Sequence, residues 1–430
     1  MDKQAPILIL GAGTFGLSTA YHLAKAGYPN VTVLEKSAAF PPELSAGNDL
    51  NKILRAEYED PFYAELALEA MAAWRTAPLF APSYHETGYL LCNSAAAPEK
   101  SKASLQKSLR SIRDRAEFRD KIVPVASRDD IRSAAPAFDG PMEGWKGYFN
   151  RFAGYASAAD ALTAVYSACV ALGVTIHLGA AVTTLKFTDD VCTGALTADG
   201  TSYDAAVTVL ALGASLGAVL PQIRRQVIAK GYPLAHVQLM PEEAAPLRGI
   251  PVTYARDLGF FFEPDRRTNL LKICPATAGY TNYGGGGSDS SSSLSLPPED
   301  NDFIPARDEV AVHRLLRETL PALAERPLIG RRVCWCADTA DSEFVIDRVP
   351  GKEGLVVVTG DSAHGFKMLP IAGKWVKDVV EKGGQENERW RWKEESDASV
   401  ADISWRVGKT TDFNEIHDFL REPEATRVKS

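Results

Sequence analysis

The chain has 430 residues, of which 45% are hydrophobic and 24% charged, and a formal net charge of −8. This length favours two or three domains, and the acidic balance argues against a nucleic-acid partner. No apolar run is long enough to span a bilayer, and the start lacks a signal-peptide pattern, so we expect no membrane association and a cytoplasmic protein. A peroxisomal location is the alternative, although the chain ends on Val428, Lys429 and Ser430 and not on a Ser-Lys-Leu address.

The start of the chain predicts a strand, a tight turn and a helix. An apolar run leads into Gly11, Gly13 and Gly16 at G-x-G-x-x-G spacing, and a second apolar run ends on Glu35, 19 residues after Gly16. The glycines permit the turn, the approach of a pyrophosphate and close packing of the helix. The helix N-terminus attracts phosphates, and the acid can accept ribose hydroxyls. The pattern predicts a dinucleotide site for FAD or NAD, since an acid argues against a 2′-phosphate.

Two later segments are predicted to extend this site. Residues 45–55 combine small residues with Asn, Asp, Lys and Arg, which suits a backbone passing a cofactor. The alternative is a loop that leads into a helix with a charged outer face. The apolar strand at 206–214 ends on small residues, as strands that return to a cofactor in doubly wound flavoproteins do.

The last third of the chain decides between the two cofactors. Residues 355–367 predict a strand, a turn at Gly360 and a helix. A second glycine turn far from the first can point its amides at a flavin pyrimidine, and a nicotinamide enzyme does not need it. FAD is therefore favoured, and an NAD-dependent dehydrogenase is the alternative that uses the first motif alone.

The predicted fold is α/β, with a doubly wound Rossmann-type FAD-binding domain and an inserted α+β substrate domain. Residues 235–239, 259–264 and 270–274 predict the antiparallel sheet of the inserted domain. The expected boundaries are 1–90, 150–225 and 325–385 for the FAD-binding domain, 91–149 and 226–324 for the substrate domain, and 386–430 for a C-terminal tail closing the substrate pocket.

Six segments together resemble the fungal amadoriases, which are fructosyl amino acid or fructosyl peptide oxidases of the monomeric sarcosine oxidase family. They are Gly-Ala-Gly-Thr-Phe-Gly at 11–16, Ser-Ala-Gly-Asn-Asp-Leu-Asn-Lys at 45–52, Trp-Lys-Gly at 145–147, Gly-Phe-Phe-Phe-Glu-Pro at 259–264, Cys-Trp-Cys-Ala-Asp-Thr at 334–339 and Gly-Phe-Lys at 365–367. The resemblance runs from residue 6 to about residue 413. It implies an oxidase that moves hydride from the carbon beside a secondary amine to flavin N5, after which the imine hydrolyses and O2 reoxidises the flavin to give H2O2.

The resemblance also implies a covalent flavin. It places the 8α-S-cysteinyl bond at Cys334 and not at Cys336, and Arg331 and Arg332 are expected to favour the thiolate. The alternative is that both cysteines are buried thiols of the core.

Further site residues follow from the same resemblance. Lys272 is implied to promote O2 reduction on the flavin re face, and Lys367 to lie beside the flavin and substrate. Lys52, Arg406 and His364 are implied to bind substrate, Arg406 through its carboxylate, although His364 serves equally well as a packing or capping residue. No metal is expected. The cofactor-binding residues expected from the motifs and the resemblance are Gly11, Gly13, Thr14, Phe15, Gly16, Glu35, Lys36, Ser45, Asn48, Asp49, Lys52, Val182, Gly213, Cys334, Asp361, Gly365, Phe366 and Lys367.

One departure from the family leaves the substrate open. Four residues after Lys272, fructosyl oxidases carry an acid that bonds the substrate amine and sugar region, whereas this chain has Ala276, preceded by Pro275. Fructosyl amino acids are the family default, and N-methyl amino acids or saccharopine are the alternatives. A further alternative is that the loss of the acid marks a flavin-binding protein without catalytic activity. The expected partners are a small-molecule amine and O2, and the expected state is a monomer.

Overall fold

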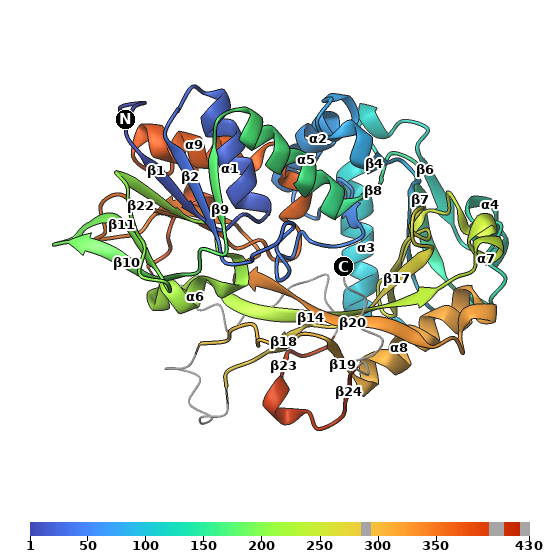
Figure 1. Cartoon of the computed structure of the whole chain (residues 1–430). Coiled ribbons are helices and arrows are strands. Elements are labelled where there is room, and N and C mark those ends of the chain that lie inside the picture. The colour runs from blue at the N-terminus through green and yellow to red at the C-terminus, as the bar shows by residue number, and fades with distance from the viewer. Residues whose placement is uncertain (285–293, 395–407, 422–430) are drawn as a thin grey trace.

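A computed structural model describes residues 1–284, 294–394 and 408–421 (Figure 1). A six-stranded sheet has the order β21-β22-β13-β1-β2-β9, in which β21 is antiparallel and its neighbours are parallel. The strands are β1 (Ile7–Leu10), β2 (Val31–Glu35), β9 (Thr175–Leu178), β13 (Val207–Leu210), β21 (Val345–Arg348) and β22 (Leu355–Thr359).

Both faces of this sheet are covered, which explains why β1 is apolar throughout. Ile7 and Ile9 pack into the core on the helical side, whereas Leu8 and Leu10 pack on the other side. This alternation follows from the two-residue period of a strand, and burial on both faces is typical of parallel sheets. The helices are α1 (Thr14–Lys25), α5 (Ala158–Ala171) and α9 (Ala372–Lys382); the opposite face carries β10 (Val182–Thr188), β11 (Val191–Thr197) and β12 (Ser202–Asp204). The predicted Rossmann-type sheet is confirmed.

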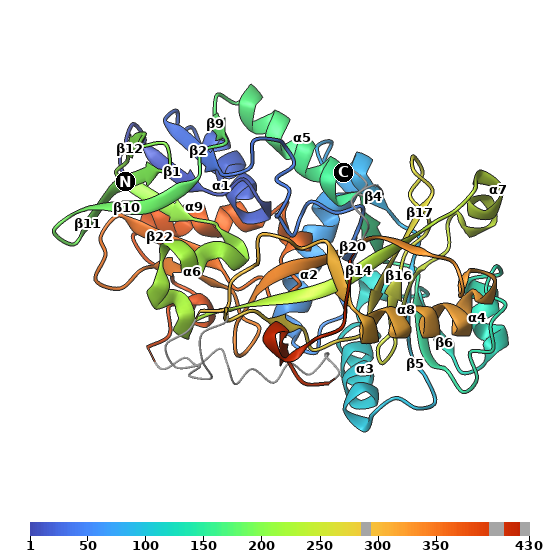
Figure 2. The same ribbon diagram turned by 60° about the horizontal axis from the view of Figure 1, so that its bottom comes forward.

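A second, mostly antiparallel sheet lies beside the first. Its order is β23-β18-β14-β17-β16-β15-β5-β7-β6, with β20 paired to β14. Helix α8 (Ala306–Thr319) packs across it (Figure 2). Its strands are β5 (Tyr89–Asn93), β6 (Ile122–Val125), β7 (Lys146–Asn150), β14 (Ile228–Gln238), β15 (Val252–Ala255), β16 (Gly259–Phe261), β17 (Leu270–Pro275), β18 (Tyr280–Thr281), β20 (Leu328–Asp338) and β23 (Thr411–Asp412). The antiparallel sheet is as predicted, and the domain boundaries stay a prediction.

Smaller elements complete the described chain. A three-stranded sheet has the order β3-β8-β4, and β19 pairs with β24. Their bounds and those of the remaining helices are β3 (Lys52–Leu54), β4 (Tyr84–His85), β8 (Gly154–Ala156), β19 (Phe303–Pro305), β24 (Phe419–Arg421), α2 (Pro61–Thr76), α3 (Glu99–Ile112), α4 (Arg128–Ala134), α6 (Leu216–Val219) and α7 (Pro241–Ala244).

The register around the long strand β14 brings two predicted site residues together. Cys334 on β20 lies opposite Tyr232, and Lys272 on β17 lies opposite His236. Tyr232 and His236 are four residues apart on one strand, so they point to the same face, and directly opposed residues share that face. Cys334 and Lys272 therefore face the same side of the sheet from strands on either side of β14.

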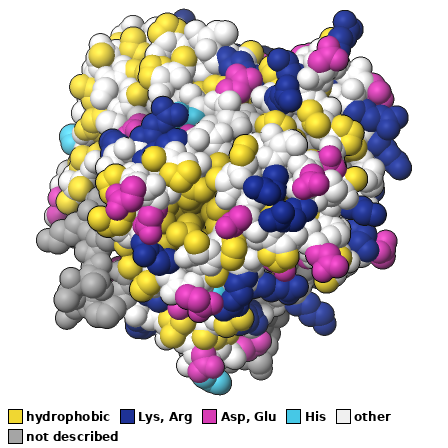
Figure 3. Space-filling view, turned by 90° about the vertical axis from the view of Figure 1, so that its right-hand side faces the viewer, with side chains coloured by type: hydrophobic (Ala, Val, Ile, Leu, Met, Phe, Trp, Pro, Cys, Tyr) yellow, Lys and Arg dark blue, Asp and Glu magenta, His cyan; other side chains and the backbone are white. Residues whose placement is uncertain are grey.

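The surface seen from the right of Figure 1 mixes charges of both signs. Lys and Arg side chains are interspersed with Asp and Glu over this face (Figure 3). In the described ranges, no helix is both long and apolar enough to cross a membrane.

The close packing of α1 on β1 gives a stability prediction. A Cβ at Gly16 would lie 1.9 Å from the Gly11 carbonyl oxygen, whereas a Cβ at Gly384 would meet nothing within 4 Å. Gly16→Ala should therefore destabilise the fold by about 1–3 kcal/mol, because the helix must shift, and Gly384→Ala should leave it nearly unchanged. Denaturant midpoints measure both; equal midpoints for Gly16→Ala and the unsubstituted protein would contradict this packing.

Candidate active site

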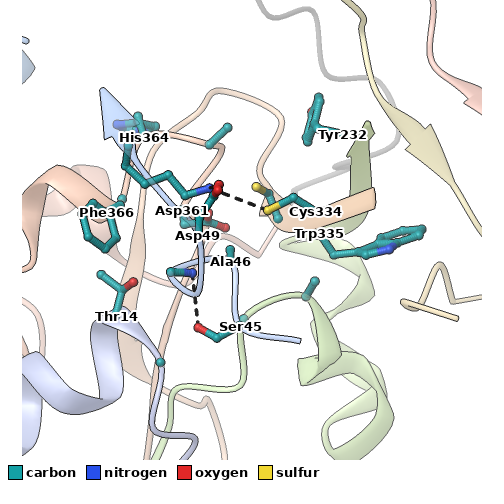
Figure 4. Close-up of a pocket in the computed structure, with 18 of the residues that line it drawn as sticks. Thr14, Ser45, Ala46, Asp49, Tyr232, Cys334, Trp335, Asp361, His364 and Phe366 are labelled. Atoms are coloured by element: carbon teal, nitrogen blue, oxygen red, sulfur yellow. Dashed lines mark hydrogen bonds and ion pairs between the residues drawn. The ribbon is translucent and has the colours of Figure 1, made fainter. Parts of the chain in front are cut away.

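A cavity of about 740 Å³ reaches from the glycine turn of β1 and α1 to the second sheet. Figure 4 shows Thr14, Phe366 and His364 on one side, Cys334, Trp335 and Tyr232 on the other, and Asp49 between them. The predicted site residues that line it are Gly11, Gly13, Thr14, Phe15, Glu35, Lys36, Ser45, Asp49, Lys52, Val182, Gly213, Lys272, Cys334, Asp361, His364, Gly365, Phe366 and Lys367. Gly16 and Asn48 are not among the residues that line it, and Arg406 lies outside the described residues.

The turn between β1 and α1 fits a dinucleotide. Gly11 has φ +100°, and a Cβ there would lie 2.5 Å from the Ala211 carbonyl oxygen. A Cβ at Gly13 would approach Ser45 Oγ at 3.2 Å and narrow the space before the first amides of α1, which have no acceptor within the helix. The Glu35 carboxylate at the end of β2 accepts from the Ala12 and Ser37 amides, each at 2.9 Å.

A second turn, which follows β22, lies against the first glycine turn. Asp361 Oδ1 accepts from the Ala337 amide at 2.7 Å and joins the end of β22 to β20. Burial raises the pKa of Asp361 to about 7. Ser362 and Ala363 both have positive φ, an uncommon conformation that occurs often at functional sites. A Cβ at Gly365 would lie 2.9 Å from Phe15 Cζ, so the two glycine turns meet directly.

Asp49 connects predicted site residues that are far apart in the sequence. Its carboxylate pairs with Lys272 Nζ, and with Lys52 Nζ at 2.8 Å. Lys272 also donates to the Asn51 carbonyl oxygen at 2.9 Å and is only 2% exposed. Lys52 Nζ lies 3.8 Å from Cys334 Sγ. A continuous line of contacts thus joins Lys272, Asp49, Lys52 and Cys334.

The acidic groups along this line of contacts differ in how their pKa values are shifted. Burial raises the pKa of Asp49, but the charges of Lys272 and Lys52 outweigh burial and hold it well below its usual range. A hydrogen bond with Cys336 and the charge of Lys52 lower the pKa of Cys334, although burial opposes them. The same hydrogen bond, together with burial, raises the pKa of Cys336. Cys334 is therefore the thiol of the pair that ionises more readily.

The arginines predicted to favour the thiolate contribute unequally. Arg331 Nε donates to Glu309 at 2.9 Å, so that its charge is engaged elsewhere. Arg332 is two residues before Cys334 on the same strand face and lowers its pKa, although less than Lys52 does. Its guanidinium also donates to the Asn48 and Glu43 carbonyl oxygens. Lys52 is the cation in contact with the sulfur.

Beside the second turn, His364 and Lys367 share a partner in Tyr58. His364 Nδ1 lies 3.2 Å from Tyr58 Oη, its Nε2 lies 2.9 Å from the Ser342 carbonyl oxygen, and its ring stacks on Phe344. Lys367 Nζ donates to Tyr58 Oη at 2.7 Å. Burial and then the charge of Arg55 lower the pKa of Lys367 well below its ordinary value.

Several cavity residues were missed by the sequence analysis. Arg55 lies beside the Tyr58 and Tyr89 rings at 5.1 and 5.9 Å, Glu57 is fully buried, and Arg256 lines the far end. Arg55 is the last residue of the polar segment 45–55, for which cofactor contact was predicted. Nothing else in the sequence marked it as a site residue. Nothing near Arg256 in the sequence marks it, because the fold alone brings it to the cavity.

Comparison with known proteins agrees with this geometry. The family model described as "FAD dependent oxidoreductase" matches residues 6–379. L-saccharopine oxidase of Schizosaccharomyces pombe is 34% identical, over 93% of this chain and 95% of that protein. The crystal structure of fructosamine oxidase (Amadoriase II) from Aspergillus fumigatus is 36% identical with a TM-score of 0.90, over 99% of each chain. Amadoriase I from the same organism is 31% identical with a TM-score of 0.87, over 98% of each chain.

The chain belongs to the FAD dependent oxidoreductase family. The predicted enzyme class, the FAD cofactor and the resemblance to the amadoriases are confirmed. This result rules against the alternative of an NAD-dependent dehydrogenase.

The contact between Lys52 and Cys334 predicts a pH effect. A lowered pKa makes the thiolate present above that lowered value, so flavin-free protein should be alkylated at Cys334 at an unusually low pH. Lys52→Met should move the alkylation midpoint to higher pH because the stabilising charge is gone. Mass spectrometry of the modified peptide gives the rate, with exposed Lys374→Met as the control. An unchanged midpoint in Lys52→Met would show that Lys52 does not tune the thiol.

Proposed function

We propose that this protein is an FAD-dependent oxidase of secondary amines that are N-substituted amino acids, releasing H2O2. The observation that carries the proposal is the buried Lys272 ammonium, held by Asp49 at the wall of the cavity that also contains Cys334. A fixed charge in a site closed from water is a strong electrostatic element. A merely structural lysine would more commonly extend to solvent.

FAD bound in this cavity would accept a hydride from the amine substrate and pass electrons to O2. The chain's residues then have distinct tasks. The first glycine turn and Glu35 would hold the dinucleotide. Cys334 Sγ would bond the 8α carbon of the ring, with the two electrons of this oxidation passing into the flavin and then to O2. Lys272 supplies positive charge where charge develops on oxygen.

The substrate would lie between the second glycine turn and the antiparallel sheet. Arg55 and Lys367 line the cavity there, and in the described chain neither is in an ion pair. A guanidinium grips a carboxylate through two parallel hydrogen bonds. We assign the substrate α-carboxylate to Arg55 and Lys367, and to His364 the task of positioning Tyr58 between them.

Two substrate classes compete. Fructosyl amino acids are favoured by the likeness to the fructosamine oxidase structures. Saccharopine is favoured by the L-saccharopine oxidase relative and by Ala276, which lines the cavity where fructosyl oxidases carry an acid. Removal of that carboxylate takes away a partner for sugar hydroxyls, so we place saccharopine-like amines ahead of fructosyl amines and N-methyl amino acids.

Anaerobic stopped-flow mixing tests the proposal. Fructosyl-valine, fructosyl-lysine, sarcosine, an N-methyl aromatic amino acid and saccharopine are each mixed with the FAD-loaded protein, and bleaching of the flavin is recorded. We expect rapid bleaching by at least one of them and H2O2 when air is admitted. A flavin that none of the amines bleaches would contradict the proposed function.

The covalent bond gives a second prediction. Cys334→Ser should leave the fold intact and FAD bound, but acid denaturation should then release all flavin, because the nucleophile is gone. Cys336→Ser is the matched control and should keep its flavin attached through denaturation. Retention of flavin by Cys334→Ser, or its release by Cys336→Ser, would move the bond to Cys336.

The role of Lys272 separates the two half-reactions. Lys272→Met should slow reoxidation by O2 about a hundredfold or more, since one fixed charge near a developing anion is lost. Reduction by the amine should change far less. Both rates come from stopped-flow absorbance, with exposed Lys374→Met as the control. Equal slowing of both half-reactions would remove the proposed task from Lys272.

A further inference from the structure

The far end of the cavity holds a second arginine, Arg256, which the proposed reaction does not use. It follows directly after β15, where its amide donates to the Cys92 carbonyl oxygen at 2.9 Å. The neighbouring Asp257 accepts from the Ser94 amide at 2.9 Å, so that the backbone is held on both sides. Arg256 is 4% exposed and lines the cavity.

The guanidinium of Arg256 is incompletely satisfied by the protein. One terminal nitrogen donates to Ser104 Oγ on α3 at 2.5 Å, while Nε is buried and has no partner among the described residues. Among the described residues, no ion pair includes Arg256. The nearby Glu59 carboxylate accepts a hydrogen bond from Ser104 Oγ and pairs with Lys107 at 3.5 Å. A buried charge without a partner is costly, and a group supplied by a ligand would satisfy it.

Arg256 and Arg55 reach the cavity from different elements. Arg55 follows β3, and its guanidinium lies 5.9 Å from the centre of the Tyr89 ring. Arg256 follows β15, and its charge also acts on the Tyr89 hydroxyl. A carboxylate that occupies the guanidinium fork of Arg55 leaves Arg256 for another anionic group.

We infer that Arg256 binds a second carboxylate, on the arm of the substrate remote from the oxidised carbon. This inference rests on the proposed function and narrows its substrate class to N-substituted amino acids with an anionic arm. A fructosyl arm offers neutral hydroxyls and an N-methyl arm offers no polar group, so both leave the buried charge uncompensated. The fork of the guanidinium suits a carboxylate and distinguishes it from a hydroxyl.

Binding of simple acids to the FAD-loaded protein tests the inference without turnover. Dicarboxylates (glutarate, adipate and pimelate) are compared with monocarboxylates of equal length (pentanoate, hexanoate and heptanoate) by isothermal titration calorimetry. We expect the best dicarboxylate to bind about tenfold to a hundredfold more tightly than its monocarboxylate partner. Equal affinities at every length in the unsubstituted protein would overturn the inference.

Three variants locate the effect. Arg256→Met should abolish the preference for dicarboxylates, Arg256→Lys should retain part of it, and exposed Arg267→Met should retain all of it. With saccharopine as substrate, Arg256→Met should raise KM at least tenfold and change kcat little. A preference that survives in Arg256→Met would overturn the inference. If that variant does not fold, the comparison in the unsubstituted protein and in Arg256→Lys still decides.

Failure of the inference and failure of the proposed function give different results. Flavin bleaching by amines without a dicarboxylate preference would overturn the inference and leave the oxidase standing. A dicarboxylate preference that depends on Arg256, with no amine bleaching the flavin, would support the anion site and overturn the oxidase.

Discussion

The site depends on one buried carboxylate. Asp49 lies between two ammonium groups, those of Lys52 and Lys272, in a cavity wall where charges attract and repel more strongly than in water. Without the carboxylate, two like charges would repel each other in the cavity wall. Asp49 instead holds both ammonium groups, one beside the thiol and one at the cavity wall.

The strand register determines which site residues lie near this carboxylate. Long strand β14 holds β20 on one side and β17 on the other, and the register sets Cys334 and Lys272 on a common face. The early loop then brings Asp49 across that face, and Lys52 follows at the start of β3. A shift by one residue in either pairing would turn a site residue to the opposite face, so the chemistry is as sensitive to register as to residue type.

Local patterns explain what the sequence could predict. The first glycine turn, the strands on either side and Glu35 lie within 35 residues, and spacing alone implies their arrangement. The second glycine turn and the antiparallel strands were visible for the same reason. The thiolate partner was not, because Lys52 and Cys334 are 282 residues apart and meet only through tertiary packing. Of the two arginines predicted from nearness in sequence, Arg332 contributes at Cys334, whereas Arg331 is paired with Glu309.

The substrate end was the least predictable part. Arg55, Tyr58, Lys367 and His364 form one group that joins a loop after β3 to the turn after β22. Arg256 reaches the same cavity from the end of β15, and no motif surrounds it. Among the described residues, neither Arg55 nor Arg256 is in an ion pair with a carboxylate, and this relation appears only when the side chains are placed together. The missing acid at Ala276, by contrast, was readable from the sequence once the family was recognised.

A crystal structure of the FAD-loaded protein would place the flavin relative to Cys334 and Lys272. We expect continuous electron density from Cys334 Sγ to the flavin ring, with Lys272 Nζ, still paired with Asp49, against one face of that ring. A ring bound elsewhere, or a Lys272 turned away from it, would show that this cavity is not built as proposed.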